Sequence, residues 1–327
     1  MTGFIKCACV VLCMLFALTG CKPDNAAVPH DTLKSETVAV KNFDFTGRVR
    51  NAKVIKNPKR IIVCGGNAVD TLIGFGVESA IHTAVLTEPD ALQIYKEKLP
   101  QAKIYPAAIS QEAAMTVKPD FILGMRRFFD DKVLGDTVFW EGNGVSAYIQ
   151  DASGPIPSLG NFPPCTIESE KNFLRNMGKI FGKEEKAESV ISEIEIELKR
   201  ANQKVAKKPK VLFIEFMPNN IEAFGKELLS GDIVEKLGGE IITYKAPFIS
   251  MEELLTVQAD VIFLVHHGGQ EQAQIELKKM HEGALTQIKA VKEKRLYTIA
   301  YDKIVATGIH TPETVRLIRQ GMYPKTL

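Results

Sequence analysis

The segment ISMEELLTVQADVIF, residues 249–263, repeats the pattern of ISQEAAMTVKPDFIL, residues 109–123. The two segments agree at seven of fifteen positions, where Ile, Ser, Glu, Thr, Val, Asp and Ile recur in the same order. Self-similarity of this kind indicates that the chain builds one structural unit twice.

Each copy begins with the pattern of a helix N-terminus. Ser110 and Ser250 stand where an N-cap residue belongs, and Glu253, three places after Ser250, completes a capping box. Glu112 and Glu252 fall in the first helical turn, where the helix dipole favours a negative charge. We therefore predict a short helix at the start of each copy.

An apolar run follows each predicted helix. The runs are FILGM after Asp120 and VIFLV after Asp260, and both are typical of buried strands. Residues 57–77, NPKRIIVCGGNAVDTLIGFGV, hold a further unit: a strand at 61–64, a turn, and a helix that Asn67 caps. Strands that alternate with helices predict an α/β fold with mostly parallel sheets, which bind ligands outside the carboxyl ends of their strands.

A longer amphipathic helix is expected between the two copies. In EEKAESVISEIEIELKRANQKVA, residues 184–206, the apolar residues recur every three or four places and so share one helix face. These residues are Ala187, Ile191, Ile194, Leu198, Ala201 and Val205. The pattern predicts two α/β lobes joined by one long helix, with a ligand cleft between the lobes.

The N-terminus has the pattern of an export signal. MTGFIKCACVVLCMLFALTGC, residues 1–21, has one cation, then an apolar run that is too short to span a membrane. The sequence before Cys21 resembles the bacterial lipobox, which implies that Cys21 carries a lipid; a plain signal peptide is the alternative. The polar residues that follow read as a flexible tether, so we expect an exported, membrane-anchored lipoprotein, facing the periplasm or the cell surface.

The expected organisation has five parts: a signal peptide at 1–20, a tether at 21–42, an N-terminal α/β lobe at 43–184, a connecting helix at 185–206 and a C-terminal α/β lobe at 207–327. The formal net charge of +2 implies no general attraction to nucleic acid. Cys64 and Cys165 are the cysteines left in the folded part, and the sequence leaves open whether they pair.

Five segments together resemble a known family, from about Phe45 to Ile318. They are residues 57–77 and 109–124 quoted above, MGKIFGKEEKAESVISEIEIEL at 177–198, GDIVEKLGGEIIT with ISMEELLTVQADVIFL at 231–243 and 249–264, and ALTQIKAVKEKRLYTI at 284–299. The order of these segments is similar to that of the helical-backbone (class III) substrate-binding proteins of bacterial ABC importers, which serve iron-siderophores, haem and cobalamin.

The resemblance implies a role for the repeated glutamates. In this family, a glutamate on each lobe contacts arginines on the two subunits of the permease dimer, and the matching positions here are Glu112 and Glu252. It also implies that the protein captures a small metal chelate, most often a ferric siderophore, with haem or cobalamin as alternatives. Ala259 stands where the family usually has a proline, and this leaves the glutamate unaffected.

The junctions that follow the strands supply candidate ligand contacts. Arg126 and Arg127 carry planar guanidinium groups that match carboxylate or catecholate oxygens, and neighbours on extended chain point in opposite directions, so we expect at most one to reach the ligand. His266 and His267 end a strand, where a histidine could contact haem iron or a ferric complex, with structural hydrogen bonding as the alternative.

Four further residues are candidates of the same kind. Tyr148, Tyr301 and His310 could contact a ferric ligand, and Trp140, the only tryptophan, could wall a pocket for a flat ligand, with core packing as its alternative role. No zinc-enzyme spacing and no phosphate-binding loop of the P-loop type occurs, so we expect no resident metal, no cofactor and no enzymatic activity.

Two other function classes remain to be weighed. An oxidoreductase could use CGGNAVDTLIGFG, residues 64–76, to bind a dinucleotide, but this run lacks the Gly-x-Gly-x-x-Gly spacing. A surface adhesin or sensor on the same scaffold would leave Glu112 and Glu252 without a function.

Overall fold

The computed structural model describes residues 36–88, 90–154, 163–200 and 207–324. The predicted signal peptide, the lipidation site Cys21, the first part of the tether, and Ala201 and Val205 of the predicted helix lie outside the described residues. No helix within these ranges has both the length and the apolar character that a membrane span requires.

The N-terminal lobe, residues 36–154, is built on a parallel five-stranded sheet in the order β5-β4-β3-β6-β7. Its strands are β3 (Ile61–Cys64), β4 (Ile81–Val85), β5 (Lys103–Tyr105), β6 (Phe121–Gly124) and β7 (Ser146–Ile149). Its helices are α1 (Gly66–Gly74), α2 (Ala91–Lys98), α3 (Gln111–Val117) and α4 (Thr137–Gly142), with 3₁₀ turns η1 (Glu78–Ala80) and η2 (Arg126–Phe129).

The C-terminal lobe, residues 207–305, holds a mixed sheet. Strands β8 (Lys210–Phe216), β12 (Val261–His266) and β13 (Leu296–Ala300) are parallel, β10 (Glu240–Ile241) pairs with β8, and β9 (Ile221–Phe224) and β11 (Phe248–Ile249) add antiparallel pairs. The helices are α7 (Leu229–Lys236), α8 (Met251–Thr256), α9 (Gln270–Met280) and α10 (Lys289–Lys292), with 3₁₀ turns η4 (Gly283–Gln287) and η5 (Tyr301–Lys303). The predicted α/β fold is confirmed, with one sheet parallel and the other mixed.

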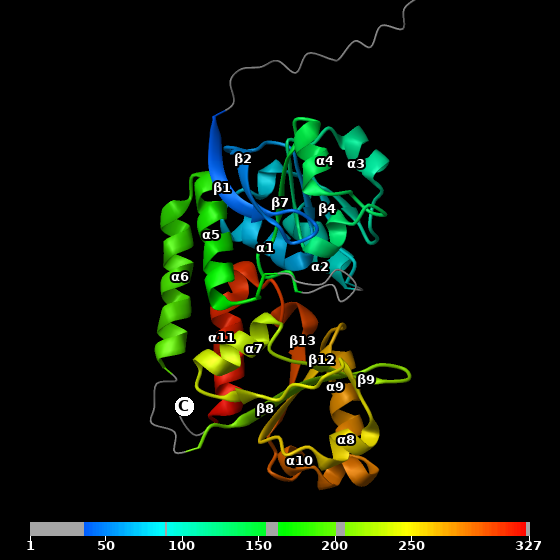
Figure 1. Cartoon of the computed structure of the whole chain (residues 1–327). Helices are drawn as coiled ribbons and strands as arrows, with labels where there is room; N and C mark the ends of the chain where they lie inside the picture. The colour runs from blue at the N-terminus through cyan, green and yellow to red at the C-terminus, as the bar shows by residue number, and fades with distance from the viewer. Residues whose placement is uncertain (1–35, 89, 155–162, 201–206, 325–327) are drawn as a thin grey trace, which may run out of the picture. The chain divides into compact units, whose positions relative to one another are not determined.

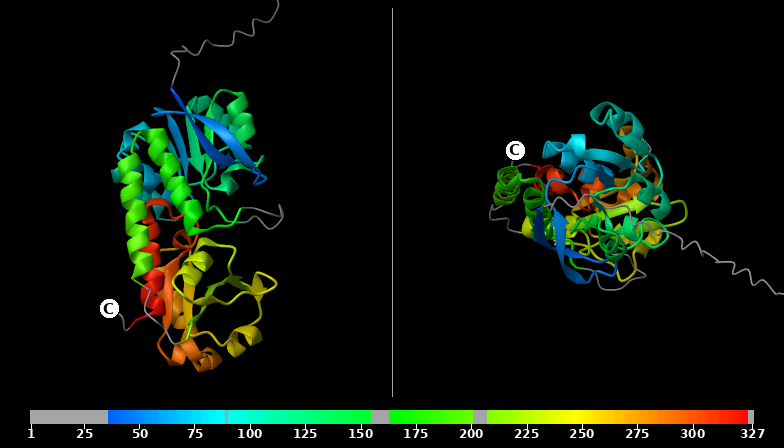
Figure 2. Two further views of the ribbon diagram at one scale, coloured as in Figure 1. Left: turned by 60° about the vertical axis from the view of Figure 1, so that its left-hand side comes forward. Right: turned by 90° about the horizontal axis from the view of Figure 1, so that it is seen from above.

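Helices α5 (Ile167–Phe181), α6 (Glu184–Lys199) and α11 (Thr311–Met322) run along one side of both lobes (Figures 1 and 2). Helix α6 covers the described part of the predicted amphipathic helix, and Ala187, Ile191 and Ile194 are buried as the pattern requires. Its polar face is not wholly in solvent, because buried Glu197 contacts Arg319 of α11 at 3.2 Å. The C-terminal helix thus packs on the predicted connecting helix, an arrangement that residue periodicity alone does not specify.

The repeated segments adopt the same local structure. The Ser110 hydroxyl accepts the Ala113 N–H at 3.2 Å, and the Ser250 hydroxyl accepts the Glu253 N–H at 3.1 Å within a complete capping box. Each of the two helices then leads into a parallel strand, β6 or β12. The predicted unit of a short helix and a parallel strand is confirmed in both copies.

The aspartates of the repeat, Asp120 and Asp260, form hydrogen bonds with the backbone next to the neighbouring strand. Asp120, before β6, accepts the backbone N–H groups of Lys59 and Arg60 at 2.6 and 2.8 Å, just before β3. Asp260, before β12, accepts the N–H of Lys210 at 2.8 Å, at the start of β8. These carboxylates satisfy backbone donors at the start of the central strands, so the repeat has a structural reason beside any functional one.

Two details of the predicted N-terminal lobe are wrong. The tether expected to run to residue 42 ends earlier, because β1 (Thr37–Phe43) pairs with β2 (Val49–Ile55) in an antiparallel hairpin. Val40 and Asn42 of β1 are both buried, as alternate residues on the inner face of the strand. The Asn42 amide forms two hydrogen bonds with the backbone of Ile149, the last residue of the edge strand β7. Asn67 does not cap α1: the cap position is Gly65, and the Asn67 amide instead donates to the Asp302 carbonyl at 2.6 Å.

Candidate functional site

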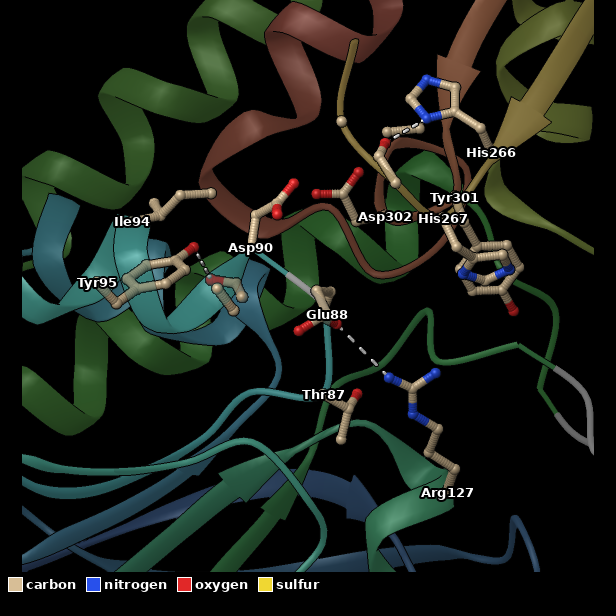
Figure 3. Close-up of a pocket in the computed structure, with 15 residues that line it drawn as sticks. Thr87, Glu88, Asp90, Ile94, Tyr95, Arg127, His266, His267, Tyr301 and Asp302 are labelled. Carbon is tan, nitrogen blue, oxygen red and sulfur yellow. Dashed lines mark hydrogen bonds and ion pairs between the residues drawn. The ribbon is translucent and has the colours of Figure 1, made fainter. Parts of the chain in front are cut away.

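A cavity of about 280 Å³ lies at the carboxyl ends of strands from both lobes (Figure 3). Residues after β3, β4 and β6 line it from the N-terminal lobe, and residues after β12 and β13 line it from the C-terminal lobe. A groove of about 670 Å³ shares Asp90 and residues 266–269 with this cavity, so the two spaces adjoin. We call the cavity and groove together the cleft.

The turn after β3 brings backbone close to the cavity. Gly65 has a φ of +97°, a conformation that only glycine adopts without strain, and it reverses the chain into α1. At Gly66, a Cβ would lie 3.1 Å from the Tyr95 hydroxyl, which donates to the Gly66 carbonyl at 3.2 Å. The two glycines thus let α1 begin at the cavity wall and let Tyr95 close its side.

An aromatic pair forms another wall. The rings of His267 and Tyr301 stack with centroids 4.5 Å apart, and Figure 3 shows them superposed on the C-terminal side of the cavity. The Nε2 of His267 lies 3.3 Å from a carboxylate oxygen of Glu215, and this hydrogen bond raises the pKa of His267. Burial raises the pKa of Tyr301, so this residue presents a neutral phenol.

Charged groups form a further part of the cavity wall. Arg127 lies 3.8 Å from a carboxylate oxygen of Glu88 and stacks over the Phe128 ring at 5.0 Å. Asp90 and Asp302 enter from opposite lobes, and in Figure 3 their carboxylates point toward one another. The cavity wall therefore carries both signs of charge, beside apolar side chains such as Ala91 and Ile94.

Of the predicted ligand residues, Arg127, His266, His267 and Tyr301 line this cavity. The paired residues behave differently from each other. Arg127 faces the cavity, whereas Arg126 is fully buried and its Nε donates to the Phe45 carbonyl at 2.6 Å. The Nδ1 of His266 lies 2.5 Å from the Gly268 carbonyl, which fixes this ring against the backbone, while His267 stacks beside the opening.

The structure places Arg126, Tyr148 and Trp140 in the core of the N-terminal lobe, so the prediction that they contact ligand is corrected. Tyr148 is completely buried and donates to Asp151 at 2.6 Å. Trp140 is 1% exposed, and its Nε1 donates to the Leu134 carbonyl at 2.8 Å. The Tyr148 hydroxyl and the Trp140 Nε1 thus have hydrogen-bond partners within the protein, as buried polar groups normally do.

His310 is also outside the cavity lining. Its Nε2 lies 2.8 Å from Asp70 of α1, and its Nδ1 lies 3.5 Å from Glu313 of α11. The residue therefore joins the N-terminal lobe to the C-terminal helix and does not face ligand.

Sequence reasoning missed the loop after β4, which supplies Thr87, Glu88 and Asp90 to the cavity, and helix α2, which supplies Tyr95. The strand was overlooked because His82 and Thr83 interrupt its apolar run, IHTAV. The Pro-Asp pair at 89–90 of the sequence, a typical turn signal, was the available indication.

Two buried acids lie at the junction between the lobes. Glu170 of α5 accepts the Gly308 N–H at 2.7 Å, in the 3₁₀ turn η6 (Gly308–His310), and burial raises its pKa to about 8. Burial likewise raises the pKa of Asp151, to about 7, although Tyr148 and Asn172 donate to it. Glu170 thus connects α5 to η6, and near it the Ala306 N–H donates to the Ala152 carbonyl at 2.9 Å.

Glu112 and Glu252 are both exposed, each in the first turn of its helix. In Figure 1 their helices, α3 and α8, lie on the side of the two sheets that faces away from α6. Neither glutamate lies in the cleft lining, so a docking role would be separate from ligand binding.

No cluster of three or more His, Cys, Asp or Glu side chains suited to a metal ion occurs in the described part of the chain. Cys64 and Cys165 are both buried free thiols.

Comparisons with known proteins agree with this architecture. The family model described as periplasmic binding protein matches residues 109–302, more than half of the chain. A periplasmic binding protein from Veillonella parvula is 25% identical, with 88% of this chain and 92% of that chain covered and a TM-score of 0.76. No curated protein matches the chain.

Two further solved structures share the fold at lower identity. An ABC-type Fe3+-hydroxamate transport system from Saccharomonospora viridis is 16% identical over 87% of this chain and 98% of that chain, with a TM-score of 0.68. The periplasmic catecholate-siderophore binding protein VctP from Vibrio cholerae is 19% identical over 87% and 99%, with a TM-score of 0.65. Since the family match spans strands of both lobes and the fold agrees over most of the chain, the chain belongs to the periplasmic binding protein family.

Proposed function

We propose that this chain is the lipid-anchored substrate-binding protein of an ABC importer, and that its ligand is a ferric siderophore. The observation that carries the proposal is the cleft itself, which lies between the two lobes. Its wall holds one guanidinium, two imidazoles and two phenols, from Arg127, His266, His267, Tyr95 and Tyr301. These groups suit the oxygen-rich surface of a metal chelate, and the polar lining is concentrated at the switch from strand to loop, where α/β proteins bind ligands.

The mechanism is binding and delivery, with no chemical step. The lobes are held by α5, α6 and α11 and by junction contacts such as Asn67 with the Asp302 carbonyl, so closure on the ligand is expected to be small. Import energy then comes from an ATPase on another polypeptide. The lipid on Cys21 keeps the protein at the membrane surface, near its permease.

Docking on the permease dimer is proposed to use Glu112 and Glu252. Their exposure and their equivalent positions in two copies of one structural unit support this role, because a two-fold permease requires the same acidic contact from each lobe. Exposed ion pairs are individually weak, about 0–1 kcal/mol each, so the pairs would act mainly on orientation and encounter.

Ligand binding is tested by isothermal titration calorimetry of the full-length protein in detergent, against ferric hydroxamates, ferric catecholates, haem and cobalamin. We expect a ferric siderophore to bind, and Tyr301→Ala to weaken its binding by roughly tenfold, because the variant removes one ring of the stacked wall. The matched control is Tyr105→Ala, at an exposed tyrosine on β5, which should bind as the unmodified protein does. Binding of haem or cobalamin alone would replace the siderophore assignment, and absence of binding to any chelate would reject the function.

Docking is tested by uptake of the radiolabelled chelate in cells that carry the permease. The double variant Glu112→Ala with Glu252→Ala should lower uptake by roughly tenfold while its affinity for the chelate stays unchanged. The control variant, Glu97→Ala with Glu282→Ala, removes the same charge from exposed positions on α2 and after α9. Normal uptake by the first variant would show that these glutamates do not dock on the permease.

A further inference from the structure

The lining of the cleft is rich in carboxylates. Arg127 is the one lysine or arginine in it, within the described residues. The carboxylates are Glu88, Asp90, Glu215, Glu271, Glu276 and Asp302. The pair of adjacent arginines had suggested an anionic ligand, but Arg126 is buried in the lobe and contributes nothing to this surface.

The cations of the cleft already face carboxylates of the protein. Arg127 lies 3.8 Å from Glu88, and His267 lies 3.3 Å from Glu215. The positive charge of Arg127, and that of His267 when it is protonated, is therefore offset before any ligand arrives. An anionic chelate would have to displace these pairings and also approach the remaining carboxylates, which would repel it.

Three of these carboxylates, Asp90, Glu271 and Asp302, form no ion pair with a basic side chain of the described residues, and of the three only Asp90 and Asp302 line the cavity itself. Asp90 comes from the loop before α2, and its carboxylate lies against Gly269 of the C-terminal lobe, where a Cβ would be 3.1 Å from Oδ2. Asp302 lies in η5 beyond β13, and its backbone carbonyl is held by Asn67. Figure 3 shows the two side chains directed toward each other across the cavity.

Like charges that face each other across a cavity repel, and a cation between them replaces this repulsion by two attractions. Because the two residues belong to different lobes, the same cation also favours the closed arrangement of the lobes. The adjoining groove adds Glu271 and Glu276 of α9 to the negative lining, where Lys279 pairs with Glu276 at 2.9 Å and Glu271 is exposed.

We infer that the cleft selects a chelate that carries positive charge, and that Asp90 and Asp302 receive the cationic group from opposite lobes. This inference rests on the proposed function and adds the charge class of the ligand. It favours a ferric hydroxamate with a free ammonium group, and it disfavours the ferric tricatecholates, which carry three negative charges.

The test uses ferric complexes of one linear trihydroxamate whose terminal amine is free, acetylated or succinylated, so that net charge runs from +1 through zero to −1 on one scaffold. A ferric tricatecholate, haem and cobalamin complete the panel. Calorimetry on the full-length protein should give the tightest binding for the free amine, at least tenfold tighter than for the succinylated form. In Asp90→Asn with Asp302→Asn, this preference should fall to within about twofold.

The matched control is Asp131→Asn with Glu293→Gln, which removes the same charge from exposed positions outside the cleft and should keep the preference. Whichever chelate of the panel binds best should lose at least tenfold in affinity in Asp90→Asn with Asp302→Asn. Unchanged or improved affinity there, or tighter binding of the succinylated form or the tricatecholate, overturns the inference while leaving the proposed function intact. If no chelate of any charge binds, the proposed function fails, and the inference fails with it.

Discussion

Glu170→Gln is expected to stabilise the protein at pH 8 by on the order of 4 kcal/mol. Glu170 is fully buried, and its Oε1 has no hydrogen-bond partner among the described residues, while Oε2 accepts from Gly308. Burial raises the pKa of this carboxyl to about 8, so the folded state keeps the proton that the unfolded state releases near pH 4 to 5.

The direction of the pH dependence follows from the proton count. Between about pH 4.5 and pH 8 the folded state binds more protons at Glu170 than the unfolded state does, so stability falls as the pH rises through this window. Glutamine is neutral in both states and removes this loss, while it can still accept from Gly308. The difference between variant and unmodified protein should therefore shrink toward zero at pH 5.

Urea unfolding followed by circular dichroism at pH 5 and pH 8 measures both quantities. Glu193→Gln, at an exposed position on α6, is the control and should change the free energy of unfolding by less than about 0.5 kcal/mol at either pH. Equal destabilisation by Glu170→Gln at both pH values would mean that the ionised carboxylate is the native form. Asp151, whose pKa burial raises to about 7, should keep part of the pH dependence in the variant.

Trp140→Ala is expected to lower the free energy of unfolding by about 3–5 kcal/mol and to leave chelate affinity unchanged. The indole is buried beside Phe139, in an edge-to-face arrangement with ring centroids 5.3 Å apart, and it satisfies the Leu134 carbonyl. Its removal leaves a cavity and an unpaired acceptor. Urea unfolding gives the stability, and calorimetry below the unfolding transition gives the affinity.

Val138→Ala, on the exposed side of the same helix, controls for the change in α4 and should cost less than about 0.5 kcal/mol. If the Trp140→Ala variant keeps its stability but loses chelate binding, the core assignment is wrong and Trp140 contacts the ligand. The core position also means that tryptophan fluorescence is a poor reporter of ligand binding here, since Trp140 is absent from the cleft lining.

Local patterns predicted the elements well, because the interactions that form them lie within a few residues. The Ser250 cap and its Glu253 partner are three residues apart, and the apolar run at 61–64 becomes β3 with the same bounds. Where a local rule failed, a distant partner was responsible. Asn67 leaves its predicted cap position for the Asp302 carbonyl, 235 residues further along the chain.

At the candidate site, residue type predicted which side chains could contact a ligand, but it did not predict which of them line the cavity. Arg126 and Arg127 are chemically identical, yet η2 turns one into the core toward Phe45 and the other into the cavity. Tyr148 and Tyr301 also differ only in their surroundings. Tyr148 packs against Phe173 in the core, whereas Tyr301 stacks on His267 at the cavity wall. The direction of a side chain at a strand end depends on contacts that periodicity does not encode.

By itself, the amino-acid sequence determined that this protein repeats a capped helix and a buried strand, that its fold is α/β, and that an acidic residue stands at the same point of each copy. These features follow from hydrogen bonds and apolar periodicity within short segments. The tertiary structure alone decided that Asp90 and Asp302 face one cavity and that Glu170 is buried against Gly308. Such pairs come from distant parts of the chain, and their proximity and burial, which set their electrostatics, arise only when the lobes pack together.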